Sequence, residues 1–393
     1  MTSGLSTQAV HAGEAKRKPY GALTMPIVQT STYTFENTAE ILDFMQRKAD
    51  NATEIRDEYG RYSNPTQAAV ERKIAALEGA EQGVLFASGM SAITTTMLAL
   101  LSCGDHLVMV SGVYHRTDEF ARCFLSRWGI ESAVVPIDDP AALNAAIRPN
   151  TRMVFAETPT NPYLRVMDLG SLVRTARKRA ILTVIDSTFA TPINLRPLEL
   201  GVDLVIHSAT KYLGGHNDLL AGAVVGSGDL TNGIRYARGI LGGVSGPHDA
   251  YLLLRGLKTL DLRIRRQNDN GQRVAEFLEA HRKVRRVYYP GLSSHPDHRV
   301  ASRQMRGFGG VVSFEIDGDM QRTSQFVDAL RLPYIGPTLG GVEGIAQQQA
   351  ILISLDPSER QQSGIADNLV RYALGIEDVD DLIADLDQAL AGI

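Results

Sequence analysis

The segment VIHSATKYLGGHND, residues 205–218, leads from an apolar run to a lysine and two glycines. The run DLVIH (203–207) has the length and composition of a buried strand. Ser208, Thr210 and Lys211 follow it directly. A lysine among hydroxyls at the mouth of a sheet can have a lowered pKa and attack an aldehyde as a nucleophile. Because lysine is seldom buried, the alternative is a solvated surface side chain, and the neighbouring segments must decide between the two.

Six further short apolar runs alternate with longer helix-like segments around this one. The alternation predicts an α/β fold in which a mostly parallel central sheet is covered by helices on both faces. In such sheets, ligands bind beyond the carboxyl ends of the strands, so the residues after each run are the candidates for chemistry. The runs are GVLFA (83–87), HLVMV (106–110), SAVVPI (132–137), RMVFAE (152–157), ILTVID (181–186) and AGAVVG (221–226).

The helix signals are clearest just before the first run. Asn64 is placed as an N-cap, Pro65 occupies the first helical position and Gly79 follows the last apolar residue of the face. They predict a helix between Asn64 and Gly79.

We expect three parts in the chain: an arm at 1–62, an α/β domain at 63–255 and a smaller α+β C-terminal domain at 256–393. The arm is predicted to be irregular, since prolines and glycines break up its short apolar runs. The last part contains a basic helical stretch from Leu262 to Arg286, the run GGVVSFEI and an amphipathic helix at 378–390.

Composition narrows the class of protein. The chain has 393 residues, of which 44% are hydrophobic and 21% charged, as in soluble globular proteins. A net charge of -4 and a pI near 6.2 favour a small-molecule partner over nucleic acid or a membrane. Two cysteines, no secretory segment and no apolar stretch of about 20 residues lead us to expect a cytoplasmic protein, without a plastid transit segment.

Two of the strand ends carry groups that suit a phosphorylated ring. Asp186 ends the run ILTVID, and a carboxylate there can pair with a protonated ring nitrogen, as pyridoxal phosphate requires; the alternative is a turn or cap. Ser88 and Gly89 lie between a strand and a helix, where backbone N–H groups can bind a phosphate, although a simple tight turn explains them equally. Ser208 and Thr210 can add hydroxyl donors.

Three other residues suit an amino-acid substrate bound against such a ring. Tyr114 follows a strand and can stack on a flat ring, unless it is an ordinary core tyrosine. Asn161 lies in a loop where its amide can bond a ring hydroxyl or a carboxylate, unless it only forms the turn before Pro162. Arg371 stands in an apolar run and needs an anion, either a substrate carboxylate or an internal partner.

Taken in order, these segments resemble the trans-sulfuration (Cys/Met metabolism) family of pyridoxal-phosphate enzymes, from Thr7 to Leu390. The resemblance implies an aspartate aminotransferase-like, type I pyridoxal-phosphate transferase fold. It also implies amino-acid substrates and a homotetramer built from two catalytic dimers. The segments that carry it are YGRYSNPT (59–66), FASGM (86–90), ETPTNP (157–162), DSTFATP (186–192), HSATKYLGGHND (207–218), TLGGVEG (338–344) and NLVRYALGIED (368–378).

The same resemblance implies a role for each candidate. Lys211 would be the Schiff-base lysine, Asp186 would pair with the pyridine nitrogen, and Tyr114 would stack on the ring. The residues that would hold the phosphate are Ser88, Gly89, Met90, Ser208 and Thr210. Those that would surround the substrate carboxylate are Asn161, Thr338 and Arg371. Tyr59 and Arg61 would reach the phosphate of the neighbouring subunit's cofactor. No metal is implied.

Within the family, the chain is most similar to the plant-type cystathionine γ-synthases. Pro337 stands where lyases and enterobacterial synthases tend to carry Glu, and His115 and Arg116 stand where those enzymes carry two glycines. The similarity implies γ-replacement on an O-activated homoserine, with cysteine as the thiol and cystathionine as the product. The alternatives are a γ- or β-elimination lyase of the cystathionine or methionine γ-lyase type, and an O-acyl- or phosphohomoserine sulfhydrylase.

Three other interpretations are weaker. Ser208 to Lys211 spells the S-x-x-K of serine acyl-transferring enzymes, but their S-D-N and K-T-G motifs are missing. His295 and His298 have no third metal ligand nearby. A nucleic-acid surface is disfavoured by the net charge of -4. Its cations would be Arg263, Arg265, Arg266, Arg282, Lys283, Arg285 and Arg286.

Overall fold

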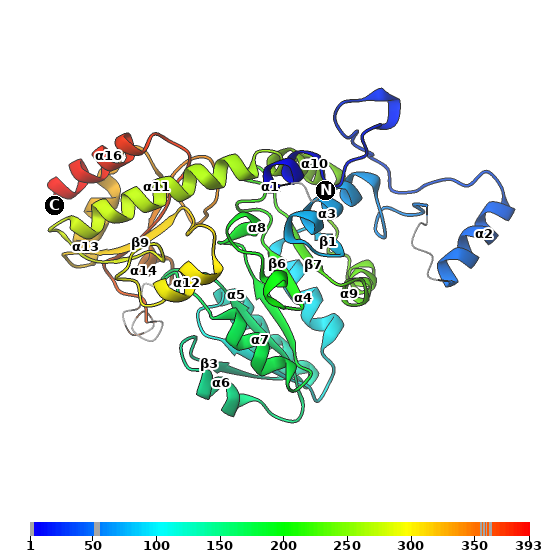
Figure 1. Ribbon diagram of the computed structural model, residues 1–393, viewed down its shortest axis with the longest axis horizontal. Coiled ribbons are helices and arrows are strands. Elements are labelled where there is room, and N and C mark those ends of the chain that lie inside the picture. The colour runs from blue at the N-terminus through cyan, green and yellow to red at the C-terminus, as the bar shows by residue number, and fades with distance from the viewer. Residues whose placement is uncertain (1–3, 51–55, 354–355, 357, 359, 361–363) are drawn as a thin grey trace.

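The computed structural model describes residues 4–50, 56–353, 356, 358, 360 and 364–393. Figure 1 shows a large sheet with flanking helices at the centre, a smaller sheet at the C-terminal end, and an N-terminal segment that extends away from both. The helices up to the end of the large sheet are α1 (Leu5–His11), α2 (Thr38–Ala49), α3 (Pro65–Glu78), α4 (Gly89–Leu100), α5 (His115–Glu119), α6 (Pro140–Ala146), α7 (Leu169–Arg177) and α8 (Thr191–Asn194). Those that follow are α9 (Gly228–Leu241), α10 (Pro247–Leu257), α11 (Leu260–Ala280), α12 (His298–Gln304), α13 (Met320–Ala329), α14 (Gln349–Ile353) and α16 (Val379–Ala391). Short turns of 3-10 or π-helix are η1 (Pro19–Gly21), η2 (Phe120–Phe124), η3 (Leu125–Trp128) and η4 (Pro197–Leu200).

The large sheet has seven strands in the order β1-β7-β6-β5-β4-β2-β3. Strands β2 to β6 pair in parallel, whereas β7 is antiparallel to both of its neighbours. All seven runs predicted from the sequence are strands, and the predicted mostly parallel sheet is confirmed. The strands are β1 (Gln82–Phe86), β2 (His106–Val110), β3 (Glu131–Val135), β4 (Thr151–Glu157), β5 (Leu182–Asp186), β6 (Leu204–His207) and β7 (Gly222–Gly226).

Both faces of this sheet are buried, which explains why its strands are continuous apolar runs. Alternate residues point to opposite faces, so Val184 packs in one cluster with Ile93 of α4. Ile185 packs in the other cluster with Ile74 of α3. The second cluster continues into the C-terminal part of the chain, where it includes Phe314.

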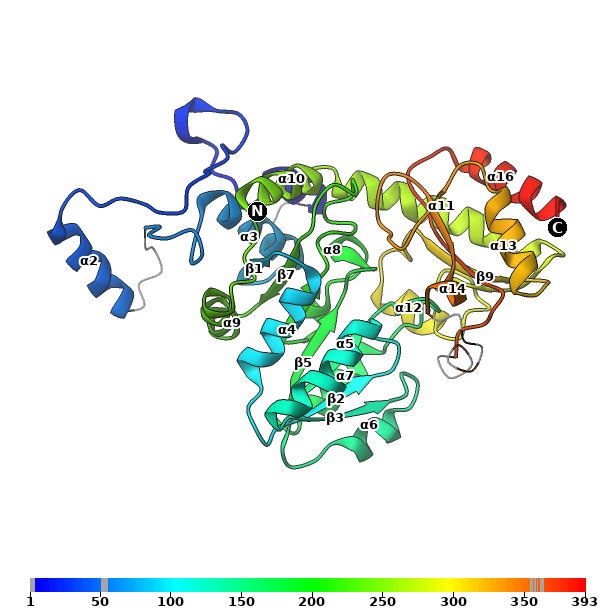
Figure 2. The same ribbon diagram turned by 180° about the vertical axis from the view of Figure 1, so that it is seen from behind.

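The smaller sheet has five strands in the order β10-β11-β12-β9-β8. Helix α11 runs from the large sheet to this sheet, as Figures 1 and 2 show from opposite sides. The division into domains at 62 and 255 stays a prediction. The strands are β8 (Val284–Tyr288), β9 (Val311–Ile316), β10 (Tyr334–Ile335), β11 (Ile345–Gln348) and β12 (Leu369–Ala373).

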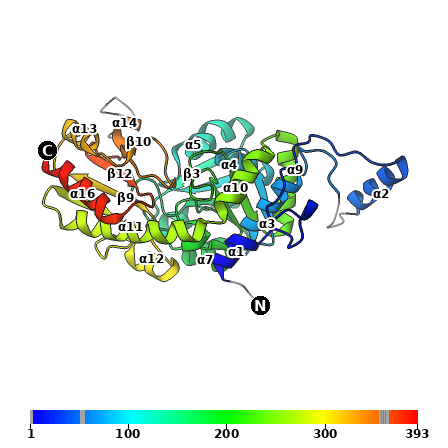
Figure 3. The ribbon, with the colours of Figure 1, turned by 90° about the horizontal axis from the view of Figure 1, so that it is seen from above.

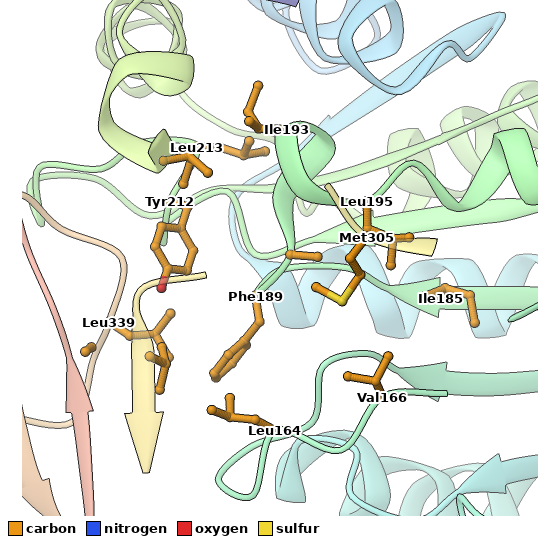
Figure 4. Close-up of a cluster of buried hydrophobic side chains, with 14 of the residues drawn as sticks. Leu164, Val166, Ile185, Phe189, Ile193, Leu195, Tyr212, Leu213, Met305 and Leu339 are labelled. Carbon is orange, nitrogen blue, oxygen red and sulfur yellow. The ribbon is translucent and has the colours of Figure 1, made fainter. Parts of the chain in front are cut away.

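A buried cluster joins the two parts next to the segment that holds Lys211. In Figure 4, Tyr212 lies beside Leu339, and Phe189 points toward Leu339 and Leu164. Gly340 packs so closely on this segment that a Cβ there would lie 2.7 Å from the backbone nitrogen of Tyr212. The loop before β11 is therefore pressed against the segment after β6.

Helix α3 begins and ends as its signals predict. The Asn64 side chain accepts hydrogen bonds from the backbone N–H groups of Thr66 and Gln67. Gly79 ends the helix with a positive φ of 71°, a conformation that costs glycine little.

The arm differs from the prediction of an irregular segment, because it contains α1 and α2. Helix α2 begins at a capping signal that we overlooked: Asn37 accepts from the backbone N–H of Glu40 at 3.0 Å. Figure 3 shows α2 well away from the sheets, whereas α1 lies against the body of the molecule. Lys73 of α3 fixes α1 by donating to the carbonyls of Ala9 and Val10.

The basic stretch also ends earlier than predicted. Helix α11 stops at Ala280, and Arg285 and Arg286 belong to strand β8. Arg263 is only 4% exposed and donates to the carbonyls of Tyr212 and Gly256, so it is wrong to place it on a nucleic-acid surface. None of the helices in the described ranges is long and apolar enough to cross a membrane.

Candidate active site

Lys211 lies directly after β6, where the sequence placed it, and it is mostly buried. Its backbone N–H donates to the carbonyl of Ser208 at 3.1 Å, which curls the segment into a turn. Its Nζ donates to the hydroxyl of Thr338 at 2.7 Å. Burial, and then the charge of Arg371, lower the pKa of Lys211 to about 8. A substantial fraction of the amine is therefore neutral and nucleophilic near pH 8.

The three residues expected around a carboxylate lie together. Arg371, in the middle of β12, donates to Asn161 Oδ1 at 3.0 Å and to the carbonyl of Thr338 at 3.0 Å. Its side chain is buried, and its Nε has no hydrogen-bond partner among the described residues. Burial lowers the pKa of Arg371 to about 10, so it stays charged at neutral pH. A buried cation with an unpaired N–H is suited to bind an anion.

Asp186 ends β5 and is 6% exposed. Its Oδ1 accepts from the backbone N–H of Thr188 at 3.0 Å and from the Thr188 hydroxyl at 2.5 Å. Burial raises the pKa of Asp186, and the two Thr188 donors oppose that rise. In the described part of the chain, Asp186 forms no salt bridge with Lys, Arg or His. Its carboxylate can therefore pair with a protonated ring nitrogen.

Thr188 is a site residue that the sequence analysis missed. Its hydroxyl donates to Asp186 and also accepts from the backbone N–H of Ser208 at 2.8 Å. It therefore connects the end of β5 to the segment that holds Lys211. The signal was the pattern D-x-T, since a threonine two residues after an aspartate can bond back to it.

The expected phosphate seat is the N-terminus of α4. Ser88 is its N-cap, but the Ser88 hydroxyl accepts from the backbone N–H of Ser91, at 3.1 Å, and so caps the helix itself. Gly89 lies against Ser208, because a Cβ at Gly89 would be 2.8 Å from the Cβ of Ser208. The N-terminus of α4, where the phosphate is expected, is thus adjacent to the segment that holds Lys211.

The remaining candidates at this end of the sheet have other visible contacts. The Thr210 hydroxyl accepts from the backbone N–H of Ala221 at 2.9 Å. The sulfur of Met90 accepts weakly from the Thr117 hydroxyl at 3.9 Å. Tyr114 is 39% exposed and precedes α5, with its ring edge-on to His115.

Tyr59 and Arg61 do not join this group within the chain. Arg61 donates to the carbonyl of Gly239 in α9 and lies over the rings of Tyr59 and Tyr62. A hollow of about 340 Å³ lies beside Tyr59 and Arg61, and none of the residues around Lys211 lines it. Its other lining residues are Gln29, Thr30, Ser31, Gly60, Asn64, Gln67, Gly242, Val244, Ser245 and Pro247. The printed contacts of these two residues are therefore separate from those of Lys211.

The chemistry of this set of groups fits pyridoxal phosphate. The lysine with a lowered pKa, the buried carboxylate of Asp186 and the N-terminus of α4 lie at one end of the large sheet. In the described part of the chain, no group of three or more His, Cys, Asp or Glu is arranged to hold a metal ion. The fold and the site together define a pyridoxal-phosphate enzyme of the aspartate aminotransferase-like class.

The comparison with protein families agrees with this class. Residues 6–391 match the family described as Cys/Met metabolism PLP-dependent enzyme. The chain belongs to this family, and its cofactor is pyridoxal 5'-phosphate. The resemblance seen in the sequence is confirmed, and the serine acyl-transfer alternative is wrong.

Individual relatives extend this result. The chain is 49% identical to cystathionine gamma-synthase 1, chloroplastic, of Nicotiana tabacum, over 98% of this chain and 71% of that protein. It is 50% identical to the protein of the same name in Arabidopsis thaliana, over 98% of this chain and 68% of that protein. The cystathionine gamma-lyase of Bacillus subtilis is 42% identical over 98% of this chain and 99% of that protein. The crystal structure of metB from Corynebacterium glutamicum superimposes with a TM-score of 0.91 at 36% identity, covering 100% and 98% of the two chains.

Proposed function

We propose that this enzyme catalyses γ-replacement on an O-activated homoserine, with cysteine as the incoming thiol and cystathionine as the product. The observation that carries the proposal is the identity of 49 and 50% to two proteins named cystathionine gamma-synthase, over 98% of the chain. The identity to a cystathionine gamma-lyase is lower, 42%. That difference favours replacement over elimination.

The proposed roles at the cofactor are those implied by the family resemblance, and the contacts described above support them. Lys211 would hold the cofactor through its aldehyde, Asp186 would keep the ring nitrogen protonated, and Tyr114 would stack on the ring. Ser88, Gly89, Met90, Ser208 and Thr210 would surround the phosphate. Gly89 and Met90 would donate backbone N–H groups at the N-terminus of α4, and Ser208 would donate its hydroxyl, because its backbone N–H already donates to Thr188. The bound cofactor supplies an electron-accepting ring for bonds broken at the substrate's Cα.

The proposed roles at the substrate rest on Arg371 and its neighbours. Arg371 would bind the α-carboxylate together with Asn161 and the hydroxyl of Thr338, which fixes the direction in which the Cα–H bond points. The Lys211 amine, with a pKa lowered to about 8, would then take the Cα proton as a general base. Tyr114 would assist proton movement or deprotonate the thiol.

The competing reactions use the same residues. In an elimination lyase, water takes the place of the thiol, and in a sulfhydrylase, sulfide takes the place of cysteine. O-Phospho-, O-succinyl- and O-acetylhomoserine should each be incubated with the enzyme, with and without cysteine or sulfide, and K211A serves as the inactive control. Cystathionine formed only with cysteine is the expected result. 2-Oxobutanoate as sole product in every incubation rejects the synthase, and homocysteine formed in preference to cystathionine makes the enzyme a sulfhydrylase.

The assembly is proposed to be a tetramer of two catalytic dimers, with the arm of each subunit completing its neighbour's site. Tyr20 and Leu23 of the arm are 97% and 89% exposed, which is unusual for large apolar residues unless a partner covers them. Tyr59 and Arg61 have no visible contact with their own subunit's Lys211 group in the described residues. Both features are those of an arm that binds a second copy. Cytoplasmic localisation stays a prediction, and the two plant relatives are described as chloroplastic.

A further inference from the structure

Glu157 is a buried carboxylic acid at the cofactor end of the sheet that neither the sequence analysis nor the proposed mechanism uses. It ends β4, pairs in register with Asp186 of β5 and is 5% exposed. Residues paired across parallel strands point to the same face, so the two carboxyl groups are neighbours.

Glu157 holds the backbone that carries Tyr114. Its Oε2 accepts from the backbone N–H of Tyr114 at 2.8 Å. The loop between β2 and Tyr114 is close-packed, because a Cβ at Gly112 would lie 2.9 Å from Cγ2 of Thr160. Tyr114 is 39% exposed and its ring contacts His115 edge-on, so the buried bond to Glu157 helps to set where the residue lies.

The two carboxyl groups have unequal surroundings. Asp186 accepts two hydrogen bonds from Thr188, whereas Glu157 accepts one, from Tyr114. Adjacent buried carboxylates repel each other, so the one that accepts more hydrogen bonds keeps its charge at lower cost. Burial, followed by the charge of Asp186, raises the pKa of Glu157 well above its ordinary value. The surroundings therefore favour a negative charge on Asp186 over one on Glu157.

We propose that Glu157 is a positioning residue that, as the neutral acid, fixes Tyr114 over the cofactor while Asp186 alone carries the negative charge. The neutral acid can donate its proton and accept the Tyr114 N–H at the same time. One negative charge then faces one protonated ring nitrogen. This inference rests on the roles proposed above for Tyr114 and Asp186, and is independent of whether the enzyme replaces or eliminates.

The test compares E157Q with E157A, and uses E276Q, an exchange on an exposed glutamate of α11, as the matched control. Glutamine keeps a neutral oxygen acceptor, so E157Q is expected to bind the cofactor to the apoenzyme within about threefold of wild type and to keep its visible circular dichroism. E157A loses the acceptor, so its affinity should fall about tenfold and its dichroism should change. Equal affinity and dichroism in E157A and wild type would overturn the positioning role.

The charge state is tested separately, so a poorly folded E157A leaves the proposal testable. An infrared difference spectrum of wild-type minus E157Q apoenzyme should contain the C=O band of a protonated carboxyl at pH 7. The pH midpoint of the bound cofactor's absorbance should be the same in E157Q and wild type. A carboxylate band, or a midpoint that moves by about one pH unit or more, would mean that Glu157 is ionised and the proposal is wrong. These readouts need no substrate, so they are unaffected if the γ-synthase assignment fails.

Discussion

Lys211 and Arg371 both donate to Thr338, the lysine amine to its hydroxyl at 2.7 Å and the guanidinium to its carbonyl at 3.0 Å. Two buried cations held on one residue disfavour each other's charge. Arg371 keeps its proton because the ordinary pKa of arginine is far higher, so Lys211 is the residue that loses its proton. The substrate-binding cation thereby helps to keep the lysine reactive.

The first prediction concerns this coupling. Covalent attachment of the cofactor aldehyde requires the neutral amine, so the rate of reconstitution of the apoenzyme should rise with pH through a midpoint near 8. R371M removes one of the two causes of the lowered pKa and should move the midpoint upward by about one pH unit. R371K keeps the charge and should leave it near that of wild type. An unmoved midpoint in R371M would mean that burial alone lowers the pKa of Lys211.

The second prediction concerns stability. The folded pKa of Lys211, about 8, lies below its usual 10.5, so the unfolded chain binds more protons between these values and stability rises with pH there. Below pH 8 the amine is charged in the folded chain, so the free energy of unfolding is lowered by the full cost of burying the ammonium group. K211M should therefore make the apoenzyme more stable at pH 7 by about 1 to 2 kcal/mol, after loss of the Thr338 hydrogen bond is included. Urea unfolding at pH 7 and pH 10 measures this gain, which should shrink at the higher pH; a destabilised K211M at pH 7 would contradict it.

The third prediction concerns Thr188. T188V removes the hydroxyl that donates to Asp186 and accepts from Ser208, so Asp186 should hold its charge less well and the cofactor should bind about 3- to 10-fold more weakly. T188S keeps the hydroxyl and is the control. Titration of each apoenzyme with pyridoxal phosphate measures the affinity. Wild-type affinity in T188V would show that the backbone N–H of Thr188 suffices.

The fourth prediction concerns the arm. R61A and K211A subunits are each expected to be impaired, but a hybrid dimer contains one site with Lys211 from one subunit and Arg61 from the other. Co-refolding equal amounts should restore activity to at most about one quarter of wild type. N161A mixed with K211A is the control, since both residues lie in the same subunit's site, and it should recover nothing. If the R61A and K211A subunits form dimers but the mixture regains no activity, Arg61 acts in the site of its own subunit and the prediction is wrong.

The sequence was sufficient for features that depend on neighbouring residues. The seven strands of the large sheet were predictable because both faces are buried and the runs are therefore continuously apolar. The bounds of α3 were predictable because capping is local, and Lys211 was identifiable because it follows a strand. Where the local signal was ignored, as at Asn37, the helix was missed.

Tertiary structure decided which groups meet and in what charge state. Thr338 lies 127 residues from Lys211 along the chain, and Arg371 lies 210 residues from Asn161, so no spacing rule joins them. Packing of β4 against β5 buries Glu157 beside Asp186. Packing of the loop before β11 against the segment after β6 brings Thr338 and Arg371 to Lys211, and so contributes to its lowered pKa. Desolvation and Coulomb interaction depend on distance in space, whereas sequence patterns record only distance along the chain.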